Sequence, residues 1–429
     1  MSNKLALLGG KPIIDKNFDD YNTIGEEEKK AVMEVLDAGK LSDFLGSASD
    51  GFNGGKWVRA IEKSWCEYFD VKHAVSMNSA TSALFAAVSA AGIGPGDEVI
   101  VPPLTMCATA TAILANNAIP IFADVDYKTM NIDPESVEKN ITPRTKAIFV
   151  VHLAGHPADM DPIMELAKKH NLIVLGDNAQ SPGAFYKDKN VGCIEDIGVF
   201  SLNCHKTIQC GEGGIAVTND DELAFRLRLV RNHGENCVKG FGRAELNILG
   251  FNLRMTEMEA AVGYHQLQKL GHQNKCRQEL AGYLTQKLIE NFDFIEPPHV
   301  QENCTHVYYL YHMYFNEEKA GIPIEVFSKA MDAEGVPLFT RWGFPIYRLP
   351  IFQNLSAAGN SGWPFKSPFY NQDISYPDGL CPMAEKSETD SIFIETMVRW
   401  PQTTSDMDLI ITAINKILEN KQELLSAEL

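Results

Sequence analysis

Short apolar runs alternate with helical patterns between residues 73 and 220, and this alternation constrains the fold more than any other feature of the chain. Two runs, AIFVV at 147–151 and LIVLG at 172–176, are apolar at almost every position, which is typical of strands buried on both faces. Helical periodicity separates the runs at 81–91, 105–116 and 163–170. The pattern predicts an α/β domain with a mainly parallel, seven-stranded sheet, whose strands are 73–78, 98–103, 119–124, 147–152, 172–177, 197–202 and 214–218.

The pattern changes near residue 250. Thr256-Glu257-Met258-Glu259 matches a capping box and predicts the start of a long helix that runs to about residue 290. After it we expect a β-rich stretch at 305–315, a helix at 324–333, a strand at 337–341 and a final helix at 405–421. We therefore predict a large domain over 1–255, including the N-terminal segment, and a smaller α+β domain over 256–429.

A long aromatic loop, residues 353–378, interrupts this second domain and is rich in Gly, Pro, Ser and Asn. Loops of this length inside a compact domain are functional lids or disordered insertions. The sequence leaves both interpretations open.

Charge and cysteine content restrict the partners and the compartment. The chain has 38 Lys and Arg against 56 Asp and Glu, a net charge of −18, which argues against nucleic-acid or anionic-membrane partners. No segment has the ~20 consecutive apolar residues of a membrane span, and the apolar run at 5–8 is too short for a signal peptide. The nine cysteines form no C-x-x-C pair, so we expect reduced thiols, no metal site and a cytoplasmic protein.

Chemically informative residues follow three of the predicted strands. The small, hydroxyl-bearing segment Asn78–Ser82 leads into a helix, where free N–H groups can bind a phosphate, although Ser79 can equally be a simple N-cap. Asp177 ends a buried strand, where a carboxylate is costly unless it meets a cation or donors. Lys206 precedes the turn at Gly211–Gly214; it is either a surface lysine or, among strand ends, a Schiff-base former. A phosphate site, a buried acid and an amine are the groups that pyridoxal phosphate requires.

Four strings carry a family resemblance. NSATSAL, DNAQSPGA, FSLNCHKTIQCGEGGIAVT and GFNLRMTEMEAAV resemble, in order and spacing, the DegT/StrS family of sugar aminotransferases, and FPIYRLPIF and CPMAEK are similar to its small domain. The opening LALLGGKPI and the length look most like the branch that aminates keto-inositols and related antibiotic precursors. The resemblance covers about residues 5–420 and implies a fold-type I pyridoxal-phosphate homodimer with active sites shared between subunits.

The resemblance also implies residue roles. Lys206 forms the internal aldimine and moves protons, and Asp177 partners the pyridinium nitrogen. The remaining cofactor contacts that it implies are Gln180 to the phenolic oxygen, Ala80, Thr81 and Ser201 to the phosphate, Met106 on the ring, and Asn252 to the phosphate of the partner subunit's site.

Three departures from the family pattern bear on the cofactor ring and the substrate. Met106 stands where many members have an aromatic residue, Tyr347 stands where many have His, and the 353–378 loop is longer than in many nucleotide-sugar members. Lys206 itself is retained, whereas a related dehydratase branch has His in its place.

Further candidates are less specific. His152 and His156 resemble a metal pair without a completing carboxylate, so we expect His156 to line the active site instead. Arg254 and Arg231 are candidates for binding the carboxylate of an amino donor, or are structural.

We therefore expect a ping-pong aminotransferase that moves an amino group from L-glutamate or L-glutamine to a nucleotide-linked keto-sugar or a keto-cyclitol. The alternatives are a sugar dehydratase that uses the same cofactor, and a non-catalytic sugar or cofactor sensor. Substitution of Lys206 would indicate the dehydratase. Loss of Lys206, Asp177 or the phosphate site would indicate the sensor.

Overall fold

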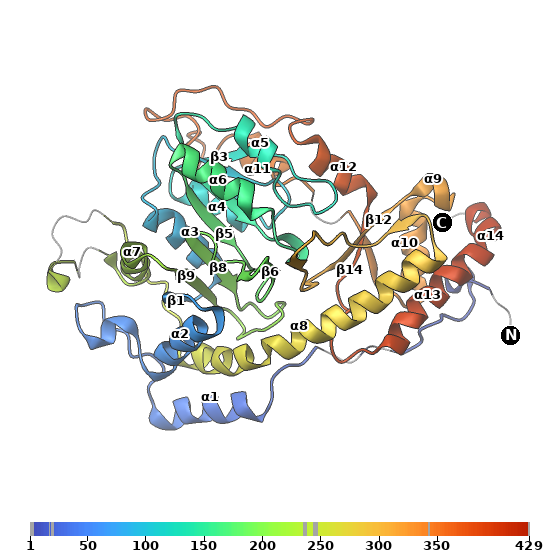
Figure 1. Cartoon of the computed structure of the whole chain (residues 1–429), viewed down its shortest axis with the longest axis horizontal. Coiled ribbons are helices and arrows are strands. Elements are labelled where there is room, and N and C mark those ends of the chain that lie inside the picture. Colours follow the sequence, from blue (N-terminus) through green and yellow to red (C-terminus); the bar gives the residue numbers. More distant parts are fainter. Residues whose placement is uncertain are drawn as a thin grey trace.

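The computed structural model describes residues 4–16, 18, 21–234, 238–242, 248–341 and 344–427. A large α/β layer structure occupies one side of the molecule and a smaller sheet with its helices occupies the other, with both termini on the smaller side (Figure 1). No helix in these described ranges is both long enough and apolar enough to cross a bilayer.

A seven-stranded sheet forms the centre of the large domain, in the order β1-β9-β8-β5-β4-β2-β3. The pairs within β8-β5-β4-β2-β3 are parallel, and β9 runs antiparallel to both of its neighbours. This confirms the mainly parallel sheet. The strands are β1 (His73–Met77), β2 (Glu98–Val101), β3 (Ile119–Phe122), β4 (Thr145–Val151), β5 (Ile173–Asp177), β8 (Ile197–Ser201) and β9 (Gly214–Thr218).

Burial of both sheet faces explains the continuous apolar runs. On β4, Phe149 and Val151 belong to one core cluster while Ile148 and Val150 belong to another. Successive side chains of a strand point to opposite faces, so both faces of β4 are covered. The covering helices are α2 (Lys56–Phe69), α3 (Ala80–Ala90), α4 (Ala108–Ala115), α5 (Pro134–Lys139), α6 (Met160–His170) and α7 (Asp221–Arg231).

The long helix α8 (Glu257–Asn291) begins where the capping box predicts. Thr256 Oγ1 accepts from Glu259 N at 3.3 Å, and Thr256 N donates to Glu259 Oε2 at 2.8 Å. The first half of α8 packs on α1 (Glu26–Ala38) and α2, and its second half runs toward α13 (Thr404–Glu419) (Figure 1). Because α8 contacts both halves of the molecule, the boundary at residue 255 stays a prediction.

The smaller sheet has the order β10-β12-β14-β13. The predicted β-rich stretch 305–315 is only partly strand: β12 (Tyr311–Phe315) joins this sheet, whereas β11 (Cys304–Thr305) pairs with β6 (Phe185–Tyr186) of the large domain, which also pairs with β7 (Lys189–Asn190). The segment between β11 and β12 therefore crosses from one domain to the other. The other elements are β10 (Ile295–Glu296), α9 (Glu317–Ala320), α10 (Ile324–Ala333), β13 (Leu338–Thr340), α11 (Pro350–Gln353), α12 (Pro382–Asp390), β14 (Ser391–Ile394) and α14 (Lys421–Ser426).

The N-terminal segment packs with the small domain, which differs from its predicted place in the large one. Leu5 and Ile14 belong to the small-domain core cluster. The backbone N–H groups of Ala6 and Ile13 donate to the Glu334 carboxylate at 2.8 and 3.0 Å. Residues 5–14 thus complete the small domain although they precede the large domain in the chain.

The aromatic loop 353–378, here called the strap, is neither an open lid nor a loose insertion. It lies along the large domain, in orange at the top of Figure 1, and buries Phe365, Tyr370 and Tyr376 to 5% exposure or less. The Tyr376 hydroxyl donates to Pro120 O on the edge strand β3 at 2.8 Å, and the Tyr370 hydroxyl donates to Glu98 Oε1 at 2.9 Å. The strap therefore covers the open edge of the sheet.

Candidate active site

Strand register brings the predicted site segments to one edge of the large sheet. Gly214, the first residue of β9, pairs with both Met77 at the end of β1 and Ser201 at the end of β8. Asp177, at the end of β5, pairs with Val199 of β8. The carboxyl ends of β1, β8 and β5 therefore meet, at the edge where α/β sheets bind ligands.

The N-terminus of α3 is an anion-binding site at this edge. Ser79 Oγ accepts from Ser82 N at 3.1 Å, so Ser79 is an N-cap. Within the described part of the chain, the N–H groups of Ala80 and Thr81 have no acceptor. A Cβ on Gly214 would lie 2.5 Å from Ala80 N, so glycine permits β9 to approach the helix end. Free N–H groups and the helix dipole favour a phosphate here.

Asp177 is a buried carboxylate without a cationic partner. It is 5% exposed, and its Oδ2 accepts from Thr109 Oγ1 at 2.7 Å while Oδ1 accepts from Ala179 N at 3.1 Å. No Lys, Arg or His of the described ranges forms an ion pair with it. A buried carboxylate is costly without a positive group, and a protonated ring nitrogen is such a group.

Gln180 is oriented by the backbone of a neighbouring loop. Its Oε1 accepts from Ala154 N at 2.7 Å. Its Nε2 group has no hydrogen-bond partner among the residues that the structure describes, so the amide donor remains for a ligand oxygen. This arrangement suits the contact to a phenolic oxygen that the resemblance implies.

Lys206 lies in the turn between β8 and β9, half-buried. Its backbone N–H donates to Asn203 O at 2.9 Å, and its Nζ lies 3.5 Å from the Tyr309 hydroxyl and 4.6 Å from the Tyr309 ring centroid. Within the described ranges no carboxylate pairs with this amine. The side chain is therefore directed by an aromatic residue rather than neutralised by an acid.

Tyr309 is a site residue that the sequence analysis missed. It lies in the crossing segment between β11 and β12, and Arg277 Nη1 donates to Tyr308 O at 3.0 Å and Tyr309 O at 3.4 Å. Tyr308 has a positive φ of 48°, which breaks the extended backbone here. The run THVYYLYHMYF predicts a continuous strand. Nothing in such a strand indicates that the Tyr309 side chain would point toward Lys206.

The other predicted cofactor residues are positioned as follows. Ser201 is 6% exposed, and its Oγ accepts from Asn203 N at 3.3 Å. Met106 is 68% exposed, just before α4. Asn252 is exposed, as a residue that reaches a partner subunit must be. No direct contact joins these three side chains to Lys206 in this chain, and their cofactor roles stay predictions.

The two candidate arginines differ. Arg231 is fully buried and pairs with Glu62 at 2.6 Å, so it is structural. Arg254 is half-buried, and its Nη1 donates to Asn232 Oδ1 at 3.1 Å. Only Arg254 keeps exposed surface, and its substrate role stays a prediction.

His156 does not present a free polar group to a substrate. It is 2% exposed, its Nε2 accepts from Gln301 N at 3.0 Å, and its Nδ1 faces Asn131 Nδ2 at 3.3 Å. Burial lowers the pKa of His156 to about 4, so the ring is neutral. These contacts fit a residue that orders the loop beside Gln180, not the substrate contact that we expected.

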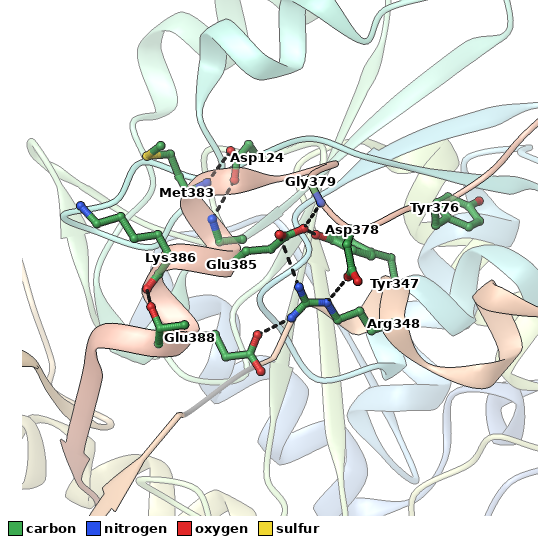
Figure 2. Close-up of polar contacts among 12 residues, drawn as sticks. Asp124, Tyr347, Arg348, Tyr376, Asp378, Gly379, Met383, Glu385, Lys386 and Glu388 are labelled. Atoms are coloured by element: carbon green, nitrogen blue, oxygen red, sulfur yellow. Dashed lines mark hydrogen bonds and ion pairs between the residues drawn. The ribbon is translucent and has the colours of Figure 1, made fainter. Parts of the chain in front are cut away.

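Tyr347 also does not fit its expected substrate role. It is 0% exposed, packs on Phe122, and donates its hydroxyl to Glu385 of α12 (Figure 2). Figure 2 shows Arg348 beside it, joined to Asp378 at the end of the strap. Tyr347 therefore makes packing and hydrogen-bond contacts near the strap and has no exposed surface with which to contact a substrate.

Taken together, the residues fit pyridoxal phosphate. Among the residues that the structure describes, the α3 N-terminus offers free N–H donors for a phosphate, Asp177 lacks a cation, Gln180 offers a free amide donor, and the Lys206 amine has no acidic partner. Each feature is costly or incomplete in the chain alone, and each matches one group of this cofactor.

Comparison with known proteins gives a consistent result. Residues 22–414 match the model of the DegT/DnrJ/EryC1/StrS aminotransferase family. The spore coat polysaccharide biosynthesis protein SpsC of Bacillus subtilis is 35% identical over 377 residues, covering 86% of this chain and 93% of SpsC. The GDP-perosamine synthase of Caulobacter vibrioides is 35% identical over 421 residues, covering 97% of this chain and 100% of the synthase.

A solved structure agrees with these relatives. DesV of S. venezuelae, determined in complex with a ketimine intermediate, has a TM-score of 0.77 and 30% identity, covering 92% of this chain and 94% of DesV. The family match over residues 22–414 includes both Asp177 and Lys206. The chain belongs to the DegT/DnrJ/EryC1/StrS family and is a pyridoxal-phosphate-dependent aminotransferase.

Proposed function

We propose that this enzyme transfers an amino group from L-glutamate or L-glutamine to the keto group of a nucleotide-linked sugar or a cyclitol, in two half-reactions. The observation that carries the proposal is the single sheet edge where the α3 N-terminus, Asp177 and the Lys206 turn meet. The relatives SpsC, named for polysaccharide biosynthesis, and GDP-perosamine synthase support a sugar as the acceptor.

The cofactor, when bound, supplies an aldehyde that accepts the amino group and a ring that accepts electrons. Ala80 and Thr81 would hold its phosphate through their backbone N–H groups, and Gln180 would donate to its phenolic oxygen. Asp177 would keep the ring nitrogen protonated through its negative charge, and Thr109 would hold the Asp177 carboxylate in place.

Lys206 has the most direct role. Its Nζ would accept a proton from the substrate carbon and donate it again during nitrogen transfer, which is general acid–base catalysis by a positioned amine. Tyr309, 3.5 Å from this nitrogen, orients the amine while it carries the proton. The Arg277 contacts to the backbone of the crossing segment keep Tyr309 in place.

We also propose a homodimer with shared active sites and a cytoplasmic location. The exposed position of Asn252, outside its own Lys206 turn, supports a contribution to the site of a partner subunit. The scattered cysteines without a C-x-x-C pair support a reducing compartment.

An absorbance spectrum of the purified enzyme, before and after addition of L-glutamate or L-glutamine, tests the proposal. We expect a yellow protein that one donor bleaches, and colour that a keto-sugar or keto-inositol restores. A protein that stays colourless with added pyridoxal phosphate would favour the sensor alternative. Bleaching followed by deoxygenation of the sugar, without amination, would favour the dehydratase alternative.

A further inference from the structure

Two arginines flank one tyrosine close to the reactive lysine. The guanidinium carbon of Arg399 lies 4.7 Å from the centre of the Tyr21 ring, and that of Arg277 lies 5.5 Å from it. The three residues come from distant parts of the chain: the segment before α1, the middle of α8, and the segment between β14 and α13. Only the tertiary fold brings them together.

Neither arginine has an acidic partner within the described ranges. Arg277 is 2% exposed and its Nε has no hydrogen-bond partner, while Arg399 is half-buried and forms no ion pair. Burial, with a smaller contribution from the Arg277 charge, lowers the pKa of Arg399, and this lowering exceeds the opposite effects of Tyr21 and Glu395. Two guanidinium groups this close, both against the Tyr21 ring, are stabilised further when an anion binds to them.

The pair is connected to Lys206 from two sides. The Tyr21 hydroxyl donates to the backbone O of Thr207, the residue after Lys206, at 2.6 Å. Arg277 holds the backbone of Tyr309, whose hydroxyl contacts Lys206. Tyr21 and Arg277 therefore connect the arginine pair to the Lys206 turn and to the segment that carries Tyr309.

Arg399 is the accessible member of the pair. Together with Tyr21 it lines a surface cavity of about 630 Å³, whereas Arg277 lies behind Tyr21. Two exposed acids, Asp15 and Asp332, also line the cavity, but neither pairs with Arg399. Lys16, also on the wall, is already neutralised by Asp406 at 3.0 Å. The free positive charge of this cavity is therefore on Arg399.

We propose that Arg399, supported by Arg277 and Tyr21, is the residue that binds an anionic oxygen group of a substrate beside Lys206. A guanidinium presents two parallel N–H donors that match a carboxylate or a phosphate. The inference rests on the proposed function, since that function supplies two such groups: the carboxylate of the amino donor and the diphosphate of a nucleotide-linked acceptor.

The test compares the cofactor-loaded wild-type enzyme with Arg399→Gln in two arms. The first arm measures the L-glutamate concentration that gives half-maximal bleaching and the rate at saturating donor. The second arm measures binding of GDP by calorimetry, with GDP as the diphosphate probe. In Arg399→Gln we expect either the L-glutamate concentration for half-maximal bleaching or the GDP dissociation constant to rise by about 10- to 100-fold. This is the effect of losing hydrogen bonds to a charged group. The bleaching rate at saturating donor should stay within about threefold.

Weakening in the donor arm identifies a carboxylate site, and weakening in the GDP arm identifies a phosphate site. Unchanged constants in both arms would overturn the proposal. Wild-type enzyme that neither L-glutamate nor L-glutamine bleaches would instead contradict the proposed function, so the two failures are distinguishable.

Two further variants separate binding from folding. Arg399→Lys keeps the charge but loses the two parallel donors, so it should recover part of the affinity lost in Arg399→Gln. Arg341→Gln is the matched control, because Arg341 is an exposed arginine of the same domain that pairs with Glu325 at 2.9 Å. It should leave both constants unchanged. Equal weakening in Arg341→Gln would show a general charge effect and overturn the proposal.

Discussion

Lys206 illustrates how one side chain acquires its chemistry from its surroundings. A lysine after a strand is ordinarily a solvated surface group, but here the amine faces Tyr309 and has no acidic partner in the described part of the chain. An ion pair with a carboxylate would stabilise the protonated, non-nucleophilic amine. Contact with the Tyr309 ring and hydroxyl orients the amine instead.

Replacement of Lys206 by alanine should abolish transamination and leave the fold intact. We expect turnover to fall at least ~10³-fold, because both the nucleophile and the proton carrier are lost. Thermal unfolding should change little, since Lys206 makes no ion pair within the described ranges. Turnover near the wild-type level in steady-state assays would disprove the assignment.

At the scale of elements, the strap covers the edge of the large sheet and connects it to α12. Tyr376 covers β3 through Pro120 O, and Gln353 Nε2 donates to Tyr376 O at 2.7 Å. At the strap's end Arg348 joins Asp378 to Glu385 and Glu388 of α12, as Figure 2 shows. An unpaired strand edge invites association with other chains, so this cover also protects the sheet.

Two substitutions at Tyr376 separate its hydrogen bond from its packing. Tyr376→Phe should cost about 1 kcal/mol of unfolding free energy, and Tyr376→Ala about 3–5 kcal/mol, because the ring is 5% exposed. Phe369→Ala is the control, since Phe369 lies in the same strap but is 59% exposed and should change stability little. Urea unfolding curves measure all three. Equal losses for Tyr376→Ala and Phe369→Ala would show that the strap is not docked.

For the whole molecule, the two domains are joined by more than chain connectivity. α8 packs on large-domain helices at its start, β11 pairs with β6 across the domains, and the N-terminal segment returns to the small domain. The active site lies beside this junction, because the crossing segment that supplies Tyr309 connects β11 to β12. Relative movement of the domains would therefore move Tyr309 with respect to Lys206.

The buried histidines predict that acid destabilises the molecule. Burial lowers the pKa to about 4 for His156, to about 3 for His312, and well below its ordinary value for His306. In the unfolded chain each titrates near 6.5. Between the two pKa values the unfolded state therefore binds more protons than the folded state. The contribution of these histidines to the unfolding free energy is complete above about pH 6.5 and decreases as the pH drops.

Each such histidine should contribute a slope of roughly 1.4 kcal/mol per pH unit between its two pKa values. His312→Phe removes one titrating ring, so it should reduce the slope of unfolding free energy between about pH 6 and 4. Urea unfolding at several pH values measures this slope. An unchanged slope would show that His312 does not stay neutral in the folded state.

The proposed sharing of active sites between subunits can be tested with mixed subunits. Lys206→Ala and Asn252→Asp should each be inactive alone, the second because a carboxylate would repel the cofactor phosphate. After mixing, a hybrid dimer would contain one site with an intact Lys206 and an intact partner's Asn252. With random assortment, about a quarter of the wild-type activity should return. No recovery, with hybrid dimers confirmed by mass, would contradict the sharing.

The sequence alone determined the large sheet and α8, because both depend on residues close together in the chain. Apolar runs specify strands buried on two faces, and the Thr256–Glu259 capping box specifies a helix start. The placement of Lys206 and Asp177 at one sheet edge was predictable from their positions after strands, since parallel strands present their carboxyl ends at one edge. Only the tertiary structure decided the surroundings of Tyr309, Tyr347 and Arg399 and the docking of the strap. Their surroundings come from segments far apart in the chain, and burial is a property of the packed molecule that no local pattern encodes.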